Sequence, residues 1–350
     1  MFLVLSNGWD GTSEAGTGGS VKKKWRILVS VVLVAVLVWR VDWTPAFAAL
    51  ARANWALWAA GLGVYLFAQA VSSLRWRLLA HVQGFSGSRL RYLAYYFIGM
   101  FFNLVLPTSI GGDMTRAWYL VTRQGAGLPR EKRQVAGFLS VSGDRLNGLF
   151  ALIGVACVAA LCCPTPLPRW IWWTVGGLAG SALAGAAVLP WVAALLASQP
   201  RLRWLAEGAS RYVNAPRTLL IATLLSFMVQ GANVLLTCLL GAALDLPVPP
   251  AYYGVLAPLV ALLALLPISL NGMGLREAGT VVLLAPLGVG AGEAVTLAVL
   301  TFAVYTAASL GGGAVLLLGR FPRYEEVRLN DHTFRGDSDQ GRTGQPSAAA

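Results

Sequence analysis

The sequence predicts an all-α membrane protein with about eight transmembrane helices and two re-entrant or broken helices, arranged as an inverted-topology repeat. Of the 350 residues, 57% are hydrophobic and only 12% are charged, against roughly 25% charged residues in soluble domains. The mean hydropathy is +0.64. In addition, one motif of Pro, Ser, Gly and Arg occurs twice between apolar runs. These three observations predict the fold class.

Eight apolar segments are predicted to cross the membrane, the longest of them exceeding the roughly 20 residues that the bilayer core requires. They are residues 25–41, 55–75, 91–106, 134–162, 170–197, 217–244, 252–267 and 293–319. The flanking residues 1–20 and 324–350 are polar, and we expect two disordered tails because they offer little apolar surface to bury. The transmembrane domain therefore covers 21–323, with halves of about 21–165 and 166–323.

Short basic loops predict the orientation of the spans, because such loops stay in the cytoplasm. The basic clusters fall within residues 22–26, 75–91, 123–133, 201–217 and 320–328. Eight spans alone cannot place all of these clusters on the cytoplasmic side. Residues 107–122 and 274–289 must therefore each carry the chain back across the membrane. Segment 107–122 would be about 24 Å long as a helix, which is short for a ~30 Å core. We therefore expect broken or re-entrant segments there, and both termini in the cytoplasm.

Both returning segments carry the repeated motif. From residue 106 the chain reads LPTSIGGDMTR, and from residue 266 it reads LPISLNGMGLRE, so that Leu, Pro, Ser, Gly and Arg match without a gap. The predicted orientation makes the two copies run in opposite directions. Paired Gly/Pro-interrupted segments in two inverted halves are the sequence feature that best indicates the binding site of a transporter.

The residue types of the motif suit an anion inside a membrane. A helix that starts after Pro107 or Pro267 presents unpaired N–H groups and the positive end of its dipole to the interior, and the following arginine can bind phosphate through two hydrogen bonds. The predicted substrate-binding residues are Ser109, Gly112, Asp113, Arg116, Ser269, Gly272, Arg276 and Glu277. Candidates for lining the same cavity are Asn103, Asp144, Arg145 and Asn271.

Charged side chains at membrane depth cost a few kcal/mol each, so we expect those of the motif to be paired or hydrated. The acidic residues differ between the copies, which suggests pairing across the repeat, Asp113 with Arg276 and Arg116 with Glu277. Alternatively, these residues lie near the interface, extend to the headgroups and only hold the fold.

Other polar positions have two interpretations each. Asp144 and Arg145 either line the cavity or form an interfacial ion pair, and Asn103 either lines the cavity or bonds a neighbouring helix. Arg75 is expected to mark the cytoplasmic end of its span. A run of glycines in the fifth span is expected to serve helix packing rather than phosphate binding: Gly176, Gly180 and Gly185.

Several classes of function are not supported. The net charge of +12 lies in short blocks between apolar runs rather than in a stripe, so we expect no nucleic-acid partner. The four cysteines have no metal spacing, and two histidines cannot build a histidine metal site or a catalytic triad. No nucleotide-binding loop is present. We therefore expect no catalytic residues, metal or cofactor, and no enzymatic activity.

Four stretches carry a resemblance to a known family: FFNLVLPTSIGGDMTRAWYL, SSLRWRLL, GDRLNGL and LPISLNGMGLREAG. Over about residues 22–320 the chain resembles the lysylphosphatidylglycerol synthase transmembrane-region family of flippase-like membrane proteins. The resemblance implies a lipid-handling domain with two re-entrant segments. Synthase members continue into further spans and a soluble domain, whereas this sequence continues into a short polar tail, so we expect a stand-alone member without aminoacyl transfer.

The leading hypothesis is a lipid flippase or lipid-translocation protein of the bacterial cytoplasmic (inner) membrane, which moves an anionic phospholipid or lipid-linked precursor between leaflets through a midplane cavity. One alternative is a membrane-embedded lipid-modifying enzyme, for which Asp113, Asp144 and Glu277 are the plausible carboxylates. The other is a non-transporting partner of lipid or cell-wall glycosyltransferases. Expected partners are therefore membrane lipids, lipid-modifying enzymes or glycosyltransferases, and further copies of the chain in a homo-oligomer.

Overall fold

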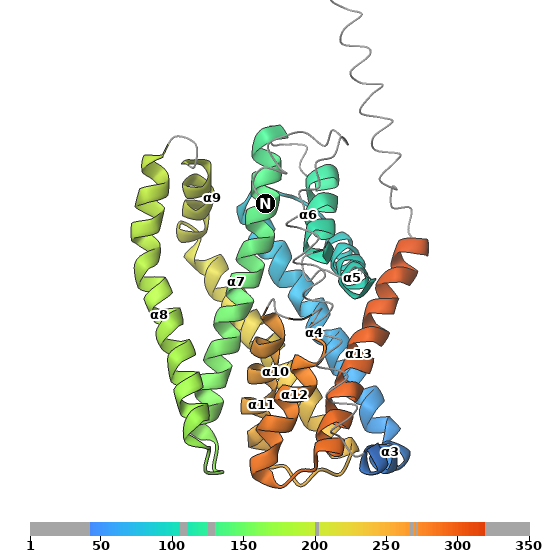
Figure 1. The fold of residues 1–350 in the computed structure, drawn as a ribbon. Coiled ribbons are helices and arrows are strands. Elements are labelled where there is room, and N and C mark those ends of the chain that lie inside the picture. The colour runs from blue at the N-terminus through green and yellow to red at the C-terminus, as the bar shows by residue number, and fades with distance from the viewer. Residues whose placement is uncertain are drawn as a thin grey trace, which may run out of the picture.

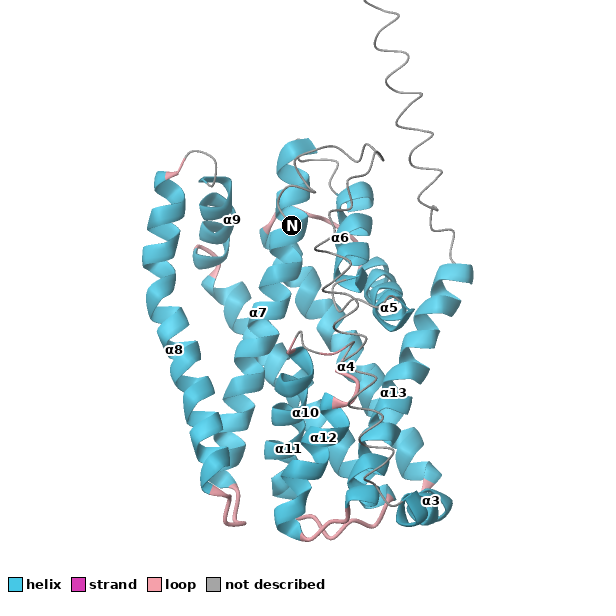
Figure 2. Ribbon diagram, viewed as in Figure 1, coloured by secondary structure: helices cyan, strands magenta, loops and turns pink. Residues whose placement is uncertain are grey.

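The computed structural model describes residues 43–105, 111–124, 130–199, 203–266, 269 and 272–318, and within these ranges the secondary structure is helical without strands (Figures 1 and 2). Five of the described helices are long and apolar enough to cross a membrane. The prediction of an all-α, multi-pass membrane protein is confirmed. The first predicted span, both predicted tails, Ser109 and Asn271 lie outside the described residues.

The five long apolar helices are interspersed with shorter ones. In order, the helices are α3 (Trp43–Arg52), α4 (Trp55–Val82), α5 (Arg89–Val105), α6 (Gly111–Gln124), α7 (Arg130–Cys162), α8 (Arg169–Ser198), α9 (Arg203–Val213), α10 (Pro216–Ala243), α11 (Pro250–Leu265), α12 (Leu275–Leu284), the 3₁₀ turn η1 (Ala285–Leu287) and α13 (Ala291–Leu318). The five candidate spans lie in α4, α7, α8, α10 and α13. Local sequence explains several starts: the Asn54 side chain accepts hydrogen bonds from two N–H groups of α4, and α10 and α11 begin with prolines, whose missing N–H costs nothing at a first helical position.

Two sets of four helices repeat the same order of lengths. Helices α4 to α7 have 28, 17, 14 and 33 residues, and α10 to α13 have 28, 16, 10 and 28. The two sets also pack in equivalent ways. Helix α5 packs on α6 of its own set and on α13 of the other, and α11 packs on α12 of its own set and on α7 of the other. The first helices of the two sets, α4 and α10, pack on each other. Helices α5 and α6 occupy the upper half of Figure 1, and α11 and α12 the lower half. This is the packing that an inverted repeat predicts; the division of the chain near residue 165 stays a prediction.

The short helices α6 and α12 cover the segments for which broken or re-entrant helices were predicted. At 1.5 Å per residue they are about 21 and 15 Å long, so neither crosses a ~30 Å core alone. Glycine permits the close packing of each on the helix before it. A Cβ at Gly112 would overlap the carbonyl oxygen of Gly99 in α5, and Gly272, with φ of 74°, has no room for a Cβ beside Ala264 of α11.

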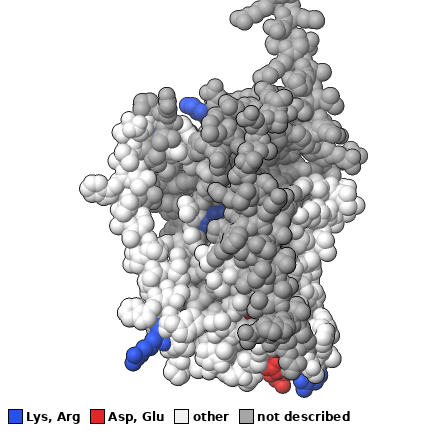
Figure 3. Space-filling view, in the orientation of Figure 1, with Lys and Arg blue, Asp and Glu red and all other residues white. Residues whose placement is uncertain are grey.

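On the face shown in Figure 3, most of the visible charged side chains of the described residues lie near the two ends of the molecule. Helix α8 stands at the side of the bundle in Figure 1, and a Cβ added at Gly176, Gly180 or Gly185 would meet nothing within 4 Å. The expected role of this glycine run in helix packing stays a prediction. One prediction is wrong: the span expected to end near residue 75 continues to Val82, and Arg75 is 5% exposed within the bundle rather than in a loop.

Candidate functional site

Five charged side chains from three helices form one ion-pair network at the centre of the first repeat. Asp144 of α7 accepts from Arg75 Nε of α4 at 2.8 Å and from Arg116 Nη1 of α6 at 3.1 Å. Asp113 of α6 accepts from Arg116 Nη2 at 2.9 Å and from Arg145 Nε at 2.7 Å. The network therefore alternates in the order Arg75, Asp144, Arg116, Asp113, Arg145, with one more positive than negative charge.

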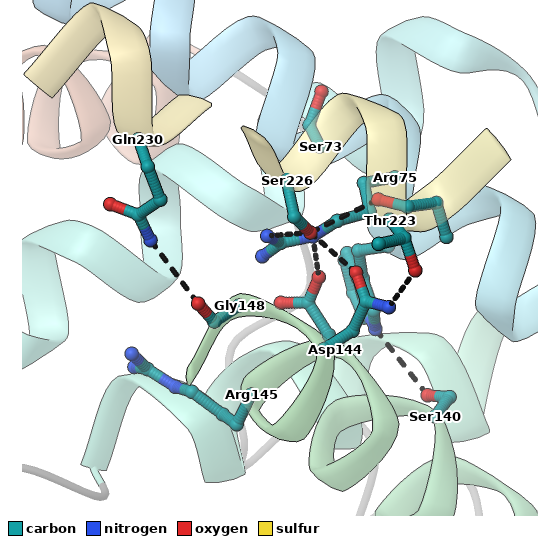
Figure 4. Close-up of polar contacts among 12 residues, drawn as sticks. Ser73, Arg75, Ser140, Asp144, Arg145, Gly148, Thr223, Ser226 and Gln230 are labelled. Carbon is teal, nitrogen blue, oxygen red and sulfur yellow. Dashed lines mark hydrogen bonds and ion pairs between the residues drawn. The ribbon is translucent and has the colours of Figure 1, made fainter. Parts of the chain in front are cut away.

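Helical spacing explains how neighbouring residues serve different parts of this network. Asp113 and Arg116 are three residues apart on α6 and share a helix face. Asp144 and Arg145 are adjacent on α7 and point in different directions (Figure 4). The Asp144 side chain is 1% exposed and faces Arg75, whereas that of Arg145 is 51% exposed. The alternative of an interfacial ion pair between Asp144 and Arg145 is thus wrong, because each binds other partners.

The predicted pairing across the repeat is also wrong. The two oxygens of Asp113 accept from Arg116 and Arg145 of its own half. Glu277 instead accepts a hydrogen bond from the Gly274 N–H at 2.7 Å, and so satisfies a backbone donor at the start of α12. The sequence pattern failed here because it did not reveal that α7 brings its own carboxylate and guanidinium to α6.

Each motif arginine lies against two aromatic rings. The guanidinium carbon of Arg116 is 5.2 Å from the ring centre of Trp76 and 4.9 Å from that of Tyr96. For Arg276 the corresponding distances are 4.8 Å to Phe302 and 5.8 Å to Tyr305. Cation–π contacts of this kind stabilise a desolvated arginine. The two arginines are 3% and 7% exposed, so they lie within the bundle and do not extend to the headgroups.

A central cavity of about 510 Å³ lies where the two repeats meet, a volume typical of sites for small molecules. Its charged lining residues are Asp113 and Arg145 from the first repeat and Arg276 from the second. Its neutral polar lining comprises Tyr65, Asn103, Gln230, Asn233, Thr237, Thr280, Thr301, Tyr305 and Ser309. In Figure 3 a basic side chain is visible at mid-height, set back behind the surrounding surface.

Asn103 fulfils both of its interpretations, because it lines the cavity and its Oδ1 accepts the Gly112 N–H at 2.8 Å. This bond satisfies one of the free donors at the start of α6. Ser269 lies close to the second motif arginine in sequence, and its Oγ is buried without a hydrogen-bond partner in the described part of the chain.

The structure thus brings four of the predicted site residues to the cavity: Asn103, Asp113, Arg145 and Arg276. The other described site residues do not line the cavity, and some of them bond to residues that do. They are Gly112, Arg116, Asp144, Ser269, Gly272 and Glu277. Whether these residues bind a substrate stays a prediction.

The sequence analysis missed a polar stripe on α10 that joins the network to the cavity. It consists of Thr223, Ser226, Gln230, Asn233 and Thr237, at alternating spacings of three and four. Arg75 Nη1 donates to Ser226 at 2.8 Å, and Gln230 donates to the Gly148 carbonyl at 3.2 Å (Figure 4). The helical period of polar residues within an apolar span was the signal that could have identified this face.

Comparison with known families agrees with this architecture. Residues 25–313 match the family described as the lysylphosphatidylglycerol synthase TM region. The chain belongs to this family. No match was found among curated proteins or among solved structures. The match to the lysylphosphatidylglycerol synthase TM region includes both copies of the motif and the helices that line the cavity, so the repeat and the cavity are parts of the family domain.

Proposed function

We propose that this protein moves a lipid with an anionic headgroup between the two leaflets, with the headgroup passing through the central cavity. The observation that carries this proposal is a cavity at the junction of two inverted repeats, lined by Arg145 from one and Arg276 from the other. Its one described lining carboxylate, Asp113, is already shared by two arginines.

The charge balance favours an anionic guest. Around the cavity and the network behind it, the described charged side chains are four arginines and two aspartates, a net charge of +2: Arg75, Arg116, Arg145, Arg276, Asp113 and Asp144. Burying more positive than negative charge in a low-dielectric interior is costly. A phosphate headgroup that enters the cavity offsets this excess, and its oxygens match the planar donors of a guanidinium.

The ion pair of Arg145 and Asp113 can exchange one of its partners for a phosphate. Because the Arg145 side chain is half exposed while remaining bonded to Asp113, an incoming phosphate can reach its outer donors. Asp113 then keeps Arg116 as its partner. The phosphate therefore replaces one carboxylate contact and leaves no carboxylate unpaired.

The inverted repeat supports access from both leaflets. The pair α5 and α6 and the pair α11 and α12 occupy opposite ends of the bundle (Figure 1), and both contribute lining residues to the one cavity. In transporters built this way, rocking of one repeat against the other alternately exposes a fixed site. The lipid tails can remain in the bilayer while the headgroup crosses.

An enzymatic role has less support from the geometry. A lipid-modifying enzyme needs an acid or base able to reach the substrate. Asp113 and Asp144 each bind two arginines, and Glu277 binds a backbone N–H. None of the three carboxylates is available without breaking a structural contact.

The test is lipid movement in proteoliposomes, measured with tail-labelled phosphatidylglycerol and a membrane-impermeant quencher. We expect the double variant Arg145→Gln, Arg276→Gln to lower the rate at least about tenfold, the effect of losing roughly 1.4 kcal/mol of headgroup binding. The control variant is Arg203→Gln on α9, whose side chain is 71% exposed and lies outside the cavity lining.

Two results would overturn the proposal in different ways. Wild-type protein that moves no labelled lipid of any headgroup class would favour the role of a non-transporting partner. A covalently altered lipid in the extracted vesicles would instead favour the enzyme.

A further inference from the structure

We infer that the lipid carried through the central cavity has a headgroup with hydroxyl groups and without an ammonium group, such as a glycerol or sugar phosphate. This inference rests on the proposed function and adds the chemical class of the headgroup. Many hydrogen-bond donors, acceptors and aromatic faces of the cavity lining already contact other parts of the protein. The groups that remain determine which headgroup fits.

Three threonines line the cavity with their hydroxyl protons already used. Thr237 donates to the Asn233 carbonyl at 3.0 Å, and Thr280 donates to the Arg276 carbonyl at 2.8 Å. Thr301 does the same to the Leu297 carbonyl at 2.8 Å. A hydroxyl has one proton and two lone pairs, so each oxygen keeps the capacity to accept a hydrogen bond from a guest.

Amide side chains supply both donors and acceptors nearby. Asn233 Nδ2 donates to Gln230 Oε1 at 3.3 Å, and Gln230 Nε2 donates to the Gly148 carbonyl at 3.2 Å. Asn103 uses its Oδ1 to accept from the Gly112 N–H, so its NH₂ donors remain for the cavity. A hydroxyl group can both donate and accept, and the hydroxyl groups of a headgroup therefore suit a lining of threonine oxygens and amides.

The carboxylate and the aromatic rings that could hold an ammonium group are already engaged. Arginines lie against Asp113, Phe302 and Tyr305, and the remaining aromatic ring of the described lining, Tyr65, packs on Tyr305 with 4.7 Å between the ring centres. Ammonium is held in proteins by a carboxylate or by the faces of aromatic rings. The lining carboxylate, Asp113, accepts from Arg145 and Arg116 through both oxygens. The rings of Phe302 and Tyr305 lie against the Arg276 guanidinium.

An ammonium headgroup would also meet like charge. It would enter a cavity whose described charged lining is two guanidinium groups and one carboxylate, a net charge of +1, with the carboxylate already bonded to one of these guanidinium groups. Like charges a few ångströms apart repel by about 4 kcal/mol at an effective dielectric constant near 20. The lining therefore favours a headgroup whose only charge is the phosphate.

The experiment measures binding and movement separately with four tail-labelled lipids. These are phosphatidylglycerol, phosphatidic acid, phosphatidylethanolamine and lysylphosphatidylglycerol, which differ in hydroxyl and ammonium content. Binding is measured by native mass spectrometry of the protein in detergent, and movement by quenching in proteoliposomes. We expect phosphatidylglycerol to bind and move at least about tenfold better than either lipid with an ammonium group, and several-fold better than phosphatidic acid.

Variant Thr237→Val tests the hydroxyl contacts without changing side-chain volume. We expect it to reduce the preference for phosphatidylglycerol over phosphatidic acid several-fold. The matched control is Thr296→Val, which removes a buried hydroxyl that donates to the Gly292 carbonyl of α13 outside the cavity lining. It should leave that preference unchanged, and an equal effect of both variants would overturn the assignment of hydroxyl recognition to this lining.

The remaining outcomes separate this inference from the proposed function. If either lipid with an ammonium group binds as well as phosphatidylglycerol, the headgroup class is wrong. Translocation then stands only if at least one labelled lipid crosses the membrane. If binding follows the expected order while no lipid crosses, the headgroup class stands and translocation is refuted. If none of the four lipids binds, both are refuted.

Discussion

Asp144 is the residue whose loss should damage this structure most, because it joins two buried arginines from different helices. Its carboxylate is 2.8 Å from Arg75 Nε and 3.1 Å from Arg116 Nη1. The side chains of the three residues are between 1% and 6% exposed. Replacement by asparagine, Asp144→Asn, preserves the shape of the side chain and removes its charge.

The loss of stability in Asp144→Asn depends on which hydrogen-bond and ion-pair partners each arginine retains. Arg116 retains Asp113 as a partner, whereas the described contacts left to Arg75 reduce to the Ser226 hydroxyl at 2.8 Å. Removing one partner from a buried ion pair costs about 3–5 kcal/mol, since the other charge stays buried without compensation. We therefore expect Asp144→Asn to lower the free energy of unfolding by about 3–5 kcal/mol.

The assay is reversible unfolding in mixed micelles with increasing sodium dodecyl sulfate, followed by tryptophan fluorescence. A control variant, Glu207→Gln, breaks an exposed pair with Arg203 on α9 and should cost about 0.3–0.5 kcal/mol. The double variant Arg75→Met, Asp144→Asn removes both members of the buried pair. Because it leaves no lone buried charge at Arg75, its loss should be smaller than the sum of the two single variants by about 0.5–3 kcal/mol. If Asp144→Asn costs no more than Glu207→Gln, the network does not hold the three helices together and the reasoning fails.

Three further predictions concern the motif and its packing. In the same unfolding assay, Gly112→Ala should lower the free energy of unfolding by at least about 2 kcal/mol, because the added Cβ overlaps the Gly99 carbonyl. The control Gly176→Ala should be neutral or stabilising, because its Cβ meets nothing within 4 Å. Equal effects of the two variants would contradict the close packing of α5 on α6. Asn103→Ala removes the acceptor of the Gly112 N–H and should cost about 1 kcal/mol, and an unchanged stability would show that this cap contributes nothing. Gly272→Ala should lower the free energy of unfolding by more than about 1 kcal/mol, because alanine disfavours the φ of 74° and its Cβ would clash with Ala264. A smaller loss would refute the need for glycine at this position.

The fold was accessible from the sequence because its strongest signals are local. Apolar length predicts spans, and the positive-inside pattern required two extra reversals of the chain, where the structure has the short helices α6 and α12. The matched motifs then predicted which helices correspond. Charge is a less certain guide to helix ends: Arg75 resembled a loop residue and is instead a buried partner of Asp144.

The site was only partly accessible, because it depends on contacts between distant segments. The structure brings Arg276 and Asp113 to one cavity, while their role in binding a substrate stays a prediction. The pairing of Asp113 with Arg145 was not predicted, since the sequence gives no distance between these two residues, which are separated by 32 positions. The polar stripe of α10 was missed because threonine, serine and glutamine within an apolar helix each have weak signals and become informative only through their shared face.

Access to the central cavity from both sides of the membrane is the claim on which the proposed mechanism depends. The most direct measurement replaces the four native cysteines, introduces Asn233→Cys in the cavity lining, and adds a membrane-impermeant maleimide to one face of the proteoliposomes at a time. The account predicts labelling from each face, slowed when phosphatidylglycerol is present. Labelling from one face alone, or from neither, would contradict it.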